Sequence, residues 1–561
     1  MLRRFGLVPF IVLVLLLLSA PTVLASGYVY EDSFGRYGSG LGEFMFPESI
    51  TVGPQGAVYV GDQSPRLQKF SSEGVVLDSV GLSGWLTAAL VDSQGSLLVV
   101  DFSGSVHVLS TGLTPQWTWT PGSTGIIGMA TADDGTIYIT DYWGSRVLAF
   151  DAGYGYLTEW PVSAPGGVAV RGDEVFVASW GLGTIEVYDR YGTFLRSFGS
   201  GAELGGPSAM AFAPDGSLLM SDYYYYRVTR WDVDAGSLME VVAPNGYGPG
   251  ELSYAWGLAV APNGDLYVPD GSEGVVQRYA WDDEAPIVTH DYDGEWHSTP
   301  VTVQFDMTDE VSGDVWNYVS TDDGATWDLA DHVDIAAPAD HSNDGVHVIL
   351  YQAVDKVSNW TAEKTVRVKI DTRKPRTAIS GVPAGWTRYD VPLLLTPSDV
   401  GSGVGGVHWR LDGTVWWNDL AEDGVVTIST EGDHLFEYYA WDNALPNNVE
   451  AVKTATVKID KTKPTPVASN AITVVRGGTA TFKYTLADNL SPTCTVTLII
   501  KKKTTTVKTV LIGTKVSTPL ATAYSKKLTI NLPVGVYTWS VKAKDLAGNS
   551  LTSPTRKLTV K

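Results

Sequence analysis

The chain contains few of the groups from which cross-linked or metal-centred proteins are built. Cys494 is its only cysteine, which excludes an intrachain disulfide and leaves packing to stabilise the fold. Of eight histidines in all, only His107 falls within residues 26–283, too few for a histidine-rich zinc site there. The sequence also lacks G-x-S-x-G, H-E-x-x-H, Walker and EF-hand signatures. We therefore expect no cofactor and no metal, and we do not expect an enzyme.

Long hydrophobic runs are also scarce, and the one that is present lies at the amino terminus. Two arginines precede the apolar run Leu7–Leu18, and the segment Val23-Leu24-Ala25 after it ends in a small residue, as cleavage sites do. This order is typical of a secretory signal. We predict a signal peptide over residues 1–25, with cleavage after Ala25. An uncleaved anchor is the alternative, although the run is shorter than the roughly 20 residues of a spanning helix. No other segment approaches that length, so we expect a secreted, extracellular protein with no membrane span after cleavage.

Positive charge is scarce over most of the chain. There are 62 acidic and 39 basic residues, which gives a net charge of -23. Residues 462–561 reverse this balance, with 15 lysines and arginines against only Asp488 and Asp545. The acidic remainder would repel nucleic acid, so nucleic-acid binding is not expected. The basic last segment instead predicts contact with an anionic component of the cell envelope.

A repeated motif occupies much of the first half of the chain. Each copy ends a β-branched or aromatic strand with a polar residue, as in GAVYVGD and GTIYITD, and the six copies are 38 to 48 residues apart, the period of propeller repeats. A short apolar strand and a glycine-containing turn precede this strand, and a third strand follows it. The polar residues are Asp62, Asp101, Asp141, Ser179, Asp222 and Asp270.

Such a unit cannot bury both faces of its small sheet alone, but neighbours stacked around an axis cover one another. We therefore predict a closed ring. No complete copy precedes the first, so Tyr28–Phe34 is left as a spare outer strand. Paired with the last copy, which ends near Tyr279, it would close the ring and remove two exposed strand edges.

The repeats resemble those of the NHL type, in which G-x-[LV]-Y-V-x-D is followed by R-[VI]-x-x-[FW] and copies are joined by S-F-G linkers. The resemblance covers residues 28–281 and implies an all-β, six-bladed β-propeller, whose domain we place at residues 26–283. Ser179 replaces the usual aspartate in the fourth copy, and the second copy lacks the arginine. These two blades are expected to be the least regular.

Beyond residue 281 the pattern changes to three modules. Hinge-like segments that contain proline delimit them, namely DDEAP at 282–286, IDTRKP at 370–375 and IDKTKP at 459–464. Short alternating strands between polar turns predict three C-terminal β-sandwich domains, at residues 284–371, 372–460 and 461–561. Their S-G-V…Y-x-x-D-G-x-x-W and A-x-D-x-A-G-N features resemble bacterial Ig-like modules of the OmpL47 type, a family found in exported and surface proteins. In the last module KKKTTTVK replaces the S-G-V hairpin, so we expect a basic Ig-like variant that sits against an anionic wall or partner.

The five repeat aspartates admit two interpretations. Carboxylates around the central channel of propeller lactonases and esterases bind calcium, so these residues could serve a metal-dependent hydrolase or lyase. Alternatively, each aspartate caps the turn that follows its strand by accepting backbone N–H bonds. The strict repetition favours the structural role, because a catalytic site needs unlike groups.

The connections that follow the repeat strands form the best candidate for a binding surface. In a propeller these connections gather on one rim, together with the loops that enter each blade. Three consecutive connections are aromatic and contain Tyr142, Trp143, Trp180, Tyr223, Tyr224, Tyr225 and Tyr226. Flat rings stack on sugars or anchor protein partners at little entropic cost, although alternate tyrosines would point into the blade.

These features predict an exported recognition or adhesion protein. Its propeller would bind a cell-surface carbohydrate or protein ligand and would be displayed by the Ig-like modules at the cell envelope. The alternatives are a calcium-dependent propeller hydrolase or lyase and a purely structural cell-wall component.

Overall fold

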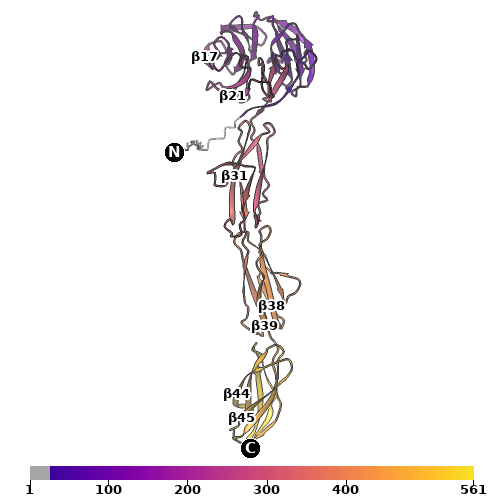
Figure 1. The fold of residues 1–561 in the computed structure, drawn as a ribbon, viewed down its shortest axis with the longest axis vertical. Helices are drawn as coiled ribbons and strands as arrows, with labels where there is room; N and C mark the ends of the chain where they lie inside the picture. The colour runs from indigo at the N-terminus through magenta and orange to yellow at the C-terminus, as the bar shows by residue number, and fades with distance from the viewer. Residues whose placement is uncertain (1–25) are drawn as a thin grey trace, which may run out of the picture.

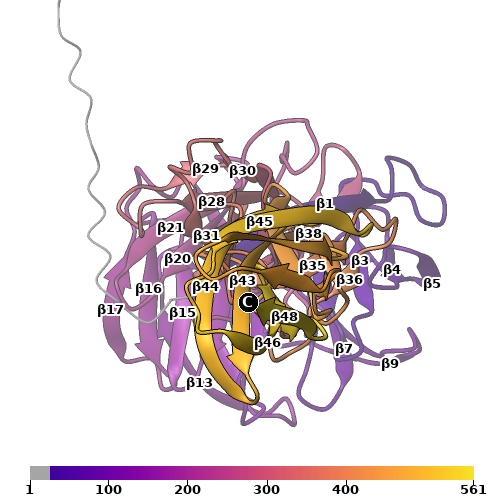
Figure 2. The same cartoon turned by 90° about the horizontal axis from the view of Figure 1, so that it is seen from below.

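All regular structure in residues 26–561, the part of the chain that the computed structural model describes, is β-strand. This confirms the all-β prediction, whereas the predicted signal peptide lies outside the described residues. Figure 1 shows a ring-shaped head and three smaller units in line below it. Seen along that line in Figure 2, the units project over the ring of strands. No helix within residues 26–561 is long and apolar enough to cross a membrane.

The head consists of antiparallel sheets of four strands each, six of them between Gly27 and Asp282. In five sheets the strands follow one another along the chain. The first holds β2 (Ser49–Val52), β3 (Val58–Gly61), β4 (Arg66–Phe70) and β5 (Val76–Gly81), and the second holds β6 (Leu86–Val91), β7 (Ser96–Asp101), β8 (Val106–Ser110) and β9 (Pro115–Trp119). The third holds β10 (Ile126–Thr131), β11 (Ile137–Asp141), β12 (Arg146–Phe150) and β13 (Tyr156–Pro161), and the fourth holds β14 (Pro165–Arg171), β15 (Glu174–Ser179), β16 (Thr184–Asp189) and β17 (Phe194–Phe198). The fifth holds β18 (Pro207–Phe212), β19 (Leu218–Asp222), β20 (Arg227–Asp232) and β21 (Ser237–Ala243).

The sixth sheet takes its outer strand from the start of the described chain. It holds β22 (Ala259–Val260), β23 (Leu266–Asp270), β24 (Val275–Asp282) and β1 (Gly27–Phe34). β1 runs antiparallel to β24, with Tyr30 opposite Tyr279, and the Arg278 guanidinium donates to both carboxylate oxygens of Asp32 at 3.0 Å. The prediction that this segment completes the last sheet is confirmed.

The sheets form a closed ring around a common centre. Their first strands, β2, β6, β10, β14, β18 and β22, pack against one another in an unbroken cycle and line a central channel. This arrangement is a β-propeller. Second strands such as β11 are buried along their whole length because the neighbouring sheets cover both faces, which explains their continuous apolar runs. In the outer strand β9, four of the five residues are exposed.

Each of the three units below the head consists of two sheets packed face to face around its own apolar core. The first pairs a sheet of β25 (Ile287–His290), β27 (Val301–Thr308) and β30 (His332–Ile335) with one of β26 (Trp296–His297), β32 (Lys364–Ile370), β31 (Gly345–Asp355), β28 (Val315–Ser320) and β29 (Asp328–Leu329). The second pairs β33 (Arg376–Ser380), β34 (Val391–Ser398) and β37 (Val425–Ile428) with β36 (Asn418–Asp419), β35 (Val404–Leu411), β38 (Gly432–Asp442) and β39 (Lys453–Ile459).

The third unit repeats this plan with longer strands. One sheet holds β40 (Thr465–Ala468), β42 (Thr479–Ala487) and β45 (Thr522–Thr529), and the other holds β41 (Ile472–Val474), β48 (Arg556–Val560), β46 (Gly535–Lys544), β43 (Thr493–Lys502) and β44 (Thr505–Val516), with β47 (Ser550–Thr552) beside β46. The basic stretch KKKTTTVK forms the tip of the β43–β44 hairpin. We call the three units together the stalk.

Candidate binding site on the propeller rim

One rim of the propeller gathers the connections between second and third strands. Backbone bonds fasten these connections to the loops that enter each sheet: Tyr142 N donates to Gly125 O at 2.8 Å, and Tyr223 N donates to Gly206 O at 2.9 Å. Each sheet therefore presents its entry loop and its connection together on this rim.

The repeat aspartates hold these loops in place. The Asp222 carboxylate accepts bonds from Gly205 N and Gly206 N at 2.9 Å in the entry loop, and from Tyr224 N at 3.2 Å in the connection. Equivalent bonds involve Asp62, Asp101, Asp141 and Asp270. In the fourth sheet the Ser179 hydroxyl makes the link instead, by donating to Ser163 O at 2.9 Å.

The five aspartates do not converge on the channel. Within residues 26–561, three groups of carboxylates come within 4.8 Å of one another, and none contains a repeat aspartate. The repeat aspartates have the geometry of turn caps. They form no shared cation site for a calcium-dependent hydrolase or lyase.

The aromatic residues of three connections do come together. Tyr142 contacts Trp143 at 4.9 Å and Trp180 at 5.6 Å between ring centroids. Trp180 in turn stacks on Tyr223 at 5.7 Å, with 20° between the planes. Tyr224 lies 5.7 Å from Trp180 and 5.2 Å from Tyr223.

Only part of this cluster faces solvent. Trp143 is 73% exposed, Tyr224 60% and Tyr225 39%, and the Tyr225 ring lies 4.9 Å from the Arg227 guanidinium. The remaining members, Tyr142, Trp180, Tyr223 and Tyr226, are half-buried beneath them. The Trp143 and Tyr224 rings thus rest on a supporting layer of aromatic side chains. We call all seven residues the aromatic rim.

Two further rings extend the cluster toward the centre. Trp256 lies 5.3 Å from Tyr223 and 5.9 Å from Trp180, and Tyr254 lies 5.5 Å from Tyr223. Both belong to the loop before β22, and the sequence analysis missed them. The sequence places entry loops on the same rim as the aromatic connections, but it does not show which of their residues contact Tyr223.

A buried carboxylate joins this cluster to a second aromatic pair. Glu48, only 3% exposed, accepts bonds from the Tyr254 hydroxyl at 2.7 Å and from Trp85 Nε1 at 2.8 Å. Burial raises the pKa of Glu48, although both bonds oppose that shift. Trp85 stacks on Phe102, with 7° between the ring planes. Phe102, which is 62% exposed, thus presents a further aromatic ring on the second sheet.

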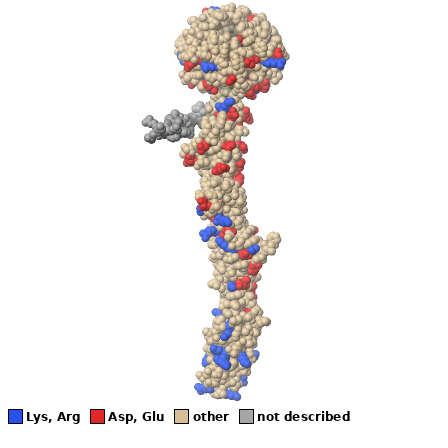
Figure 3. Space-filling model, viewed as in Figure 1, with Lys and Arg blue, Asp and Glu red and all other residues tan. Residues whose placement is uncertain are grey.

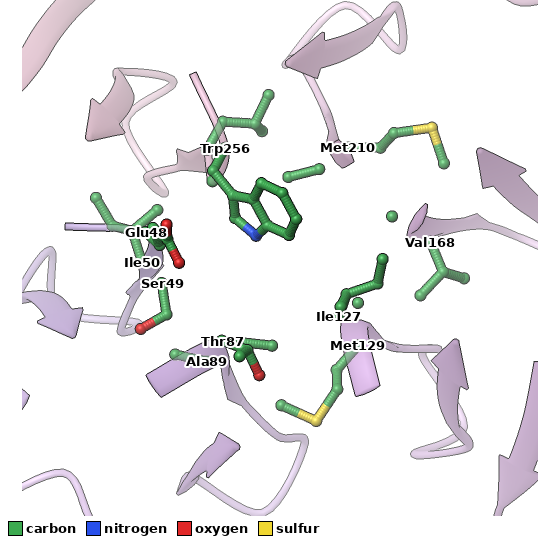
Figure 4. A pocket seen from close by; sticks show the side chains of 16 residues that line it. Glu48, Ser49, Ile50, Thr87, Ala89, Ile127, Met129, Val168, Met210 and Trp256 are labelled. Carbon is green, nitrogen blue, oxygen red and sulfur yellow. The ribbon is translucent and has the colours of Figure 1, made fainter. Parts of the chain in front are cut away.

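The channel itself is narrow. Figure 4 shows Trp256 projecting into it, with Met129, Met210 and Ile127 among the other side chains of the lining. Its free space is about 70 Å³, whereas sites for small organic ligands usually hold about 300–1,000 Å³. This narrow part cannot hold a sugar or peptide, whereas about 820 Å³ of free space lies at the channel mouth on the opposite rim, lined by Val52, Val91, Ala211 and Val260 among others.

The aromatic rim faces away from the stalk. β24 begins next to Asp270 on this rim and ends at Asp282 on the opposite one, where the first unit of the stalk follows. Gly27 pairs with Asp282, so the described chain also begins at the opposite rim. A ligand can therefore approach the aromatic rim without meeting the stalk.

Comparisons with known proteins leave the family open. No protein-family model and no curated protein matches the sequence. Among solved structures, the extracellular domain of BT3049 from B. thetaiotaomicron, described as a hybrid two-component system, is 10% identical with a TM-score of 0.31, over 92% of this chain and 91% of that domain. BamB from Moraxella catarrhalis is 18% identical over 42% of this chain and 85% of its own, with a TM-score of 0.28. The Dos1 propeller is 13% identical over 46% of this chain and 81% of its own, with a TM-score of 0.31. At such scores the propeller assignment rests on the strand pairing of this chain.

Proposed function

We propose that the protein is an exported, non-enzymatic recognition or adhesion protein that binds a cell-surface carbohydrate or protein through its aromatic rim. The observation that carries this proposal is the run of stacked rings on the face opposite the stalk. Exposed rings held by a rigid aromatic layer lose little entropy on binding and offer large contact areas. The stalk would hold this face away from the cell envelope.

We also assign the head to the six-bladed NHL type and the stalk to Ig-like modules of the OmpL47 type. The repeat sequences and the six four-stranded sheets support the first assignment, and the two-sheet plan of each stalk unit supports the second. Both assignments agree with an exported, envelope-associated protein.

The third stalk unit is proposed to contact an anionic envelope component. Figure 3 shows acidic side chains over the head and upper stalk, and basic ones over the last unit. Residues 462–561 hold 15 basic side chains against two carboxylates. Such a surface attracts polyanions at low ionic strength, and salt weakens the attraction.

Two other functions have less support. At the end of the channel near the aromatic rim, a hydrolase or lyase would have only about 70 Å³ of free space, and the repeat aspartates there are bonded to their own loops. A purely structural wall component would make no use of the exposed rings, so it predicts that their removal has no effect on adhesion.

A glycan array probed with the purified protein and with rim variants tests the proposal. Trp143→Ala and Tyr224→Ala should each weaken binding at least tenfold, because a central aromatic anchor contributes about 2 kcal/mol or more. Tyr191→Ala is the matched control, since Tyr191 is 75% exposed and lies in the β16–β17 turn on the opposite rim. Specific glycan hits support a carbohydrate ligand, and a silent array favours a protein ligand. Surface adhesion that survives both rim substitutions would contradict the proposal.

A further inference from the structure

Three aspartates meet at each joint of the molecule: between the head and the stalk, and at the two boundaries within the stalk. One comes from the end of the preceding unit, one from the turn that follows β27, β34 or β42, and one from the carboxyl end of β31, β38 or β46. Their carboxylate oxygens lie within 4.8 Å of one another in every case. We call them the junction carboxylates: Asp282, Asp309 and Asp355; Asp371, Asp399 and Asp442; and Asp460, Asp488 and Asp545.

The first junction contains buried oxygen atoms that have no partner. Asp282 is 1% exposed and its Oδ2 makes no hydrogen bond. The Ser312 hydroxyl, on a residue that is 7% exposed, has no hydrogen-bond partner of ordinary geometry and lies close enough to the same carboxylate to lower its pKa. Asn359 is fully buried, donates to Asp355 Oδ2 at 2.8 Å, and has an unpartnered Oδ1. Buried polar atoms are almost always satisfied, so this set of oxygens indicates a missing partner that is an electron-pair acceptor.

The same arrangement recurs at the other two junctions. An asparagine that follows the third aspartate donates to the main chain of the first: Asn448 Nδ2 bonds Asp371 O at 2.8 Å, and Asn549 Nδ2 bonds Asp460 O at 2.7 Å. A serine three residues after the second aspartate is also present in all three units, as Ser312, Ser402 and Ser491. At the third junction Asp545 is 6% exposed and its Oδ2 has no partner.

No cationic side chain in the described part of the chain neutralises these groups. Within residues 26–561, none of the nine junction carboxylates forms an ion pair with lysine, arginine or histidine. Burial, with Asp309 and Asp355 close by, raises the pKa of Asp282 to about 6. Burial, with Asp460 and Asp545 close by, likewise raises the pKa of Asp488 to about 6. Three neighbouring like charges, of which at least two are buried at every junction, are unfavourable without a counter-ion.

We propose that each junction binds one calcium ion, so that the protein carries three calcium sites outside the propeller channel. The ligands on offer are all oxygen: three carboxylates, with the Ser312 hydroxyl beside those of the first junction. Calcium accepts six to eight such ligands in flexible geometry, whereas zinc and copper prefer nitrogen and sulfur. The sites do not depend on what the aromatic rim binds.

Calcium at these positions would join consecutive units. Each site takes its first aspartate from the end of one unit and the other two from the loops of the next. A bound cation would therefore replace repulsion between units by a shared bond, and would restrict their bending.

Calorimetric titration of the purified, chelator-treated protein with CaCl₂ tests this proposal. We expect three equivalents of calcium to bind at concentrations up to about 1 mM, the range of extracellular calcium modules. Small-angle scattering should show that the largest dimension of the molecule has a narrower distribution with calcium than without it. No binding heat up to about 10 mM, ten times that range, or magnesium binding of equal affinity, would overturn the proposal.

Substitutions at the second aspartate locate the sites. Asp309→Asn should reduce the stoichiometry from three to two, and Asp309→Asn with Asp399→Asn and Asp488→Asn should abolish binding. Asparagine has the same shape and removes repulsion, so these variants should fold in calcium-free buffer, which circular dichroism checks. Asp306→Asn is the matched control, because Asp306 is exposed on β27 just before the first junction. Three equivalents bound by the triple variant would show that the junctions are not the sites.

Discussion

Closure of the propeller by β1 can be tested at Tyr28. Its ring is 7% exposed, belongs to the core between the fifth and sixth sheets, and contacts Trp281 edge-on at 5.0 Å. Its hydroxyl is buried without a hydrogen-bond partner. The ring therefore stabilises the closed propeller, whereas the hydroxyl does not.

The two parts of the side chain give opposite expectations. Tyr28→Ala removes a buried aromatic ring, for which losses start at about 3 kcal/mol. A domain of this size loses roughly 2–4 °C per kcal/mol, so the unfolding midpoint of the head should fall by about 6–12 °C. Tyr28→Phe removes only the unpartnered hydroxyl and should leave the midpoint unchanged or raise it slightly.

Thermal unfolding combined with amide hydrogen exchange of β24 provides the assay. Exchange at β24 reports directly on the loss of β1, because the two strands are paired from Gly27 to Phe34. Tyr191→Ala, at an exposed tyrosine of the head, gives the baseline for loss of a surface ring. If Tyr28→Ala shifted neither the midpoint nor the exchange of β24 more than Tyr191→Ala does, the closed ring would be refuted.

Two other substitutions or probes test the packing of the head and of the last stalk unit. A Cβ at Gly167 would lie 2.4 Å from Ser208 O in the next inner strand, so Gly167→Ala should lower the stability of the head by about 1–3 kcal/mol. Gly201→Ala is the control and should lower it hardly at all, because a Cβ there meets nothing within 4 Å. Equal melting temperatures of the two variants would contradict the close approach of the inner strands. Burial raises the pKa of the Cys494 thiol to about 11, and the thiolate is the reactive form. A disulfide reagent at about pH 8 should therefore label Cys494 only in denaturant. Rapid labelling of the native protein would show that the core of the third stalk unit is open.

The repeat made the inner strands of the head predictable. Second strands such as β11 are buried on both faces, so their apolar runs recur in every copy. Outer strands such as β9 carry no such pattern because most of their residues face solvent. The closing strand was predictable only because an incomplete copy at one end of a ring must pair with the other end.

The aromatic rim was less predictable than the ring. Its seven residues lie in connections that directly follow the repeat aspartates. This fixed position predicted that they share one rim. Trp256 and Tyr254 belong to an entry loop whose length differs among the copies, so no register placed them in the cluster. Glu48 was missed for the same reason, although it binds both Tyr254 and Trp85.

The junction carboxylates could not be predicted from the sequence, for a different reason. Asp282, Asp309 and Asp355 come from three separate segments, each of which carries an ordinary sequence signal for a hinge or a polar turn. Asp309 illustrates this, since its carboxylate accepts the amides of Val311 and Ser312 as a turn aspartate does. Only the pairing of strands across the unit shows that the three carboxylates share one space.

The composition of these joints determines how the stalk responds to its surroundings. An apolar interface between units would keep them aligned under all ionic conditions. At the second joint the units instead meet through backbone contacts such as Ser298 N to Leu445 O at 3.0 Å, beside the carboxylates of Asp371, Asp399 and Asp442. Such a joint is repulsive without a cation and cohesive with one. With calcium bound as proposed, the stiffness of the stalk should therefore follow the calcium concentration around the protein.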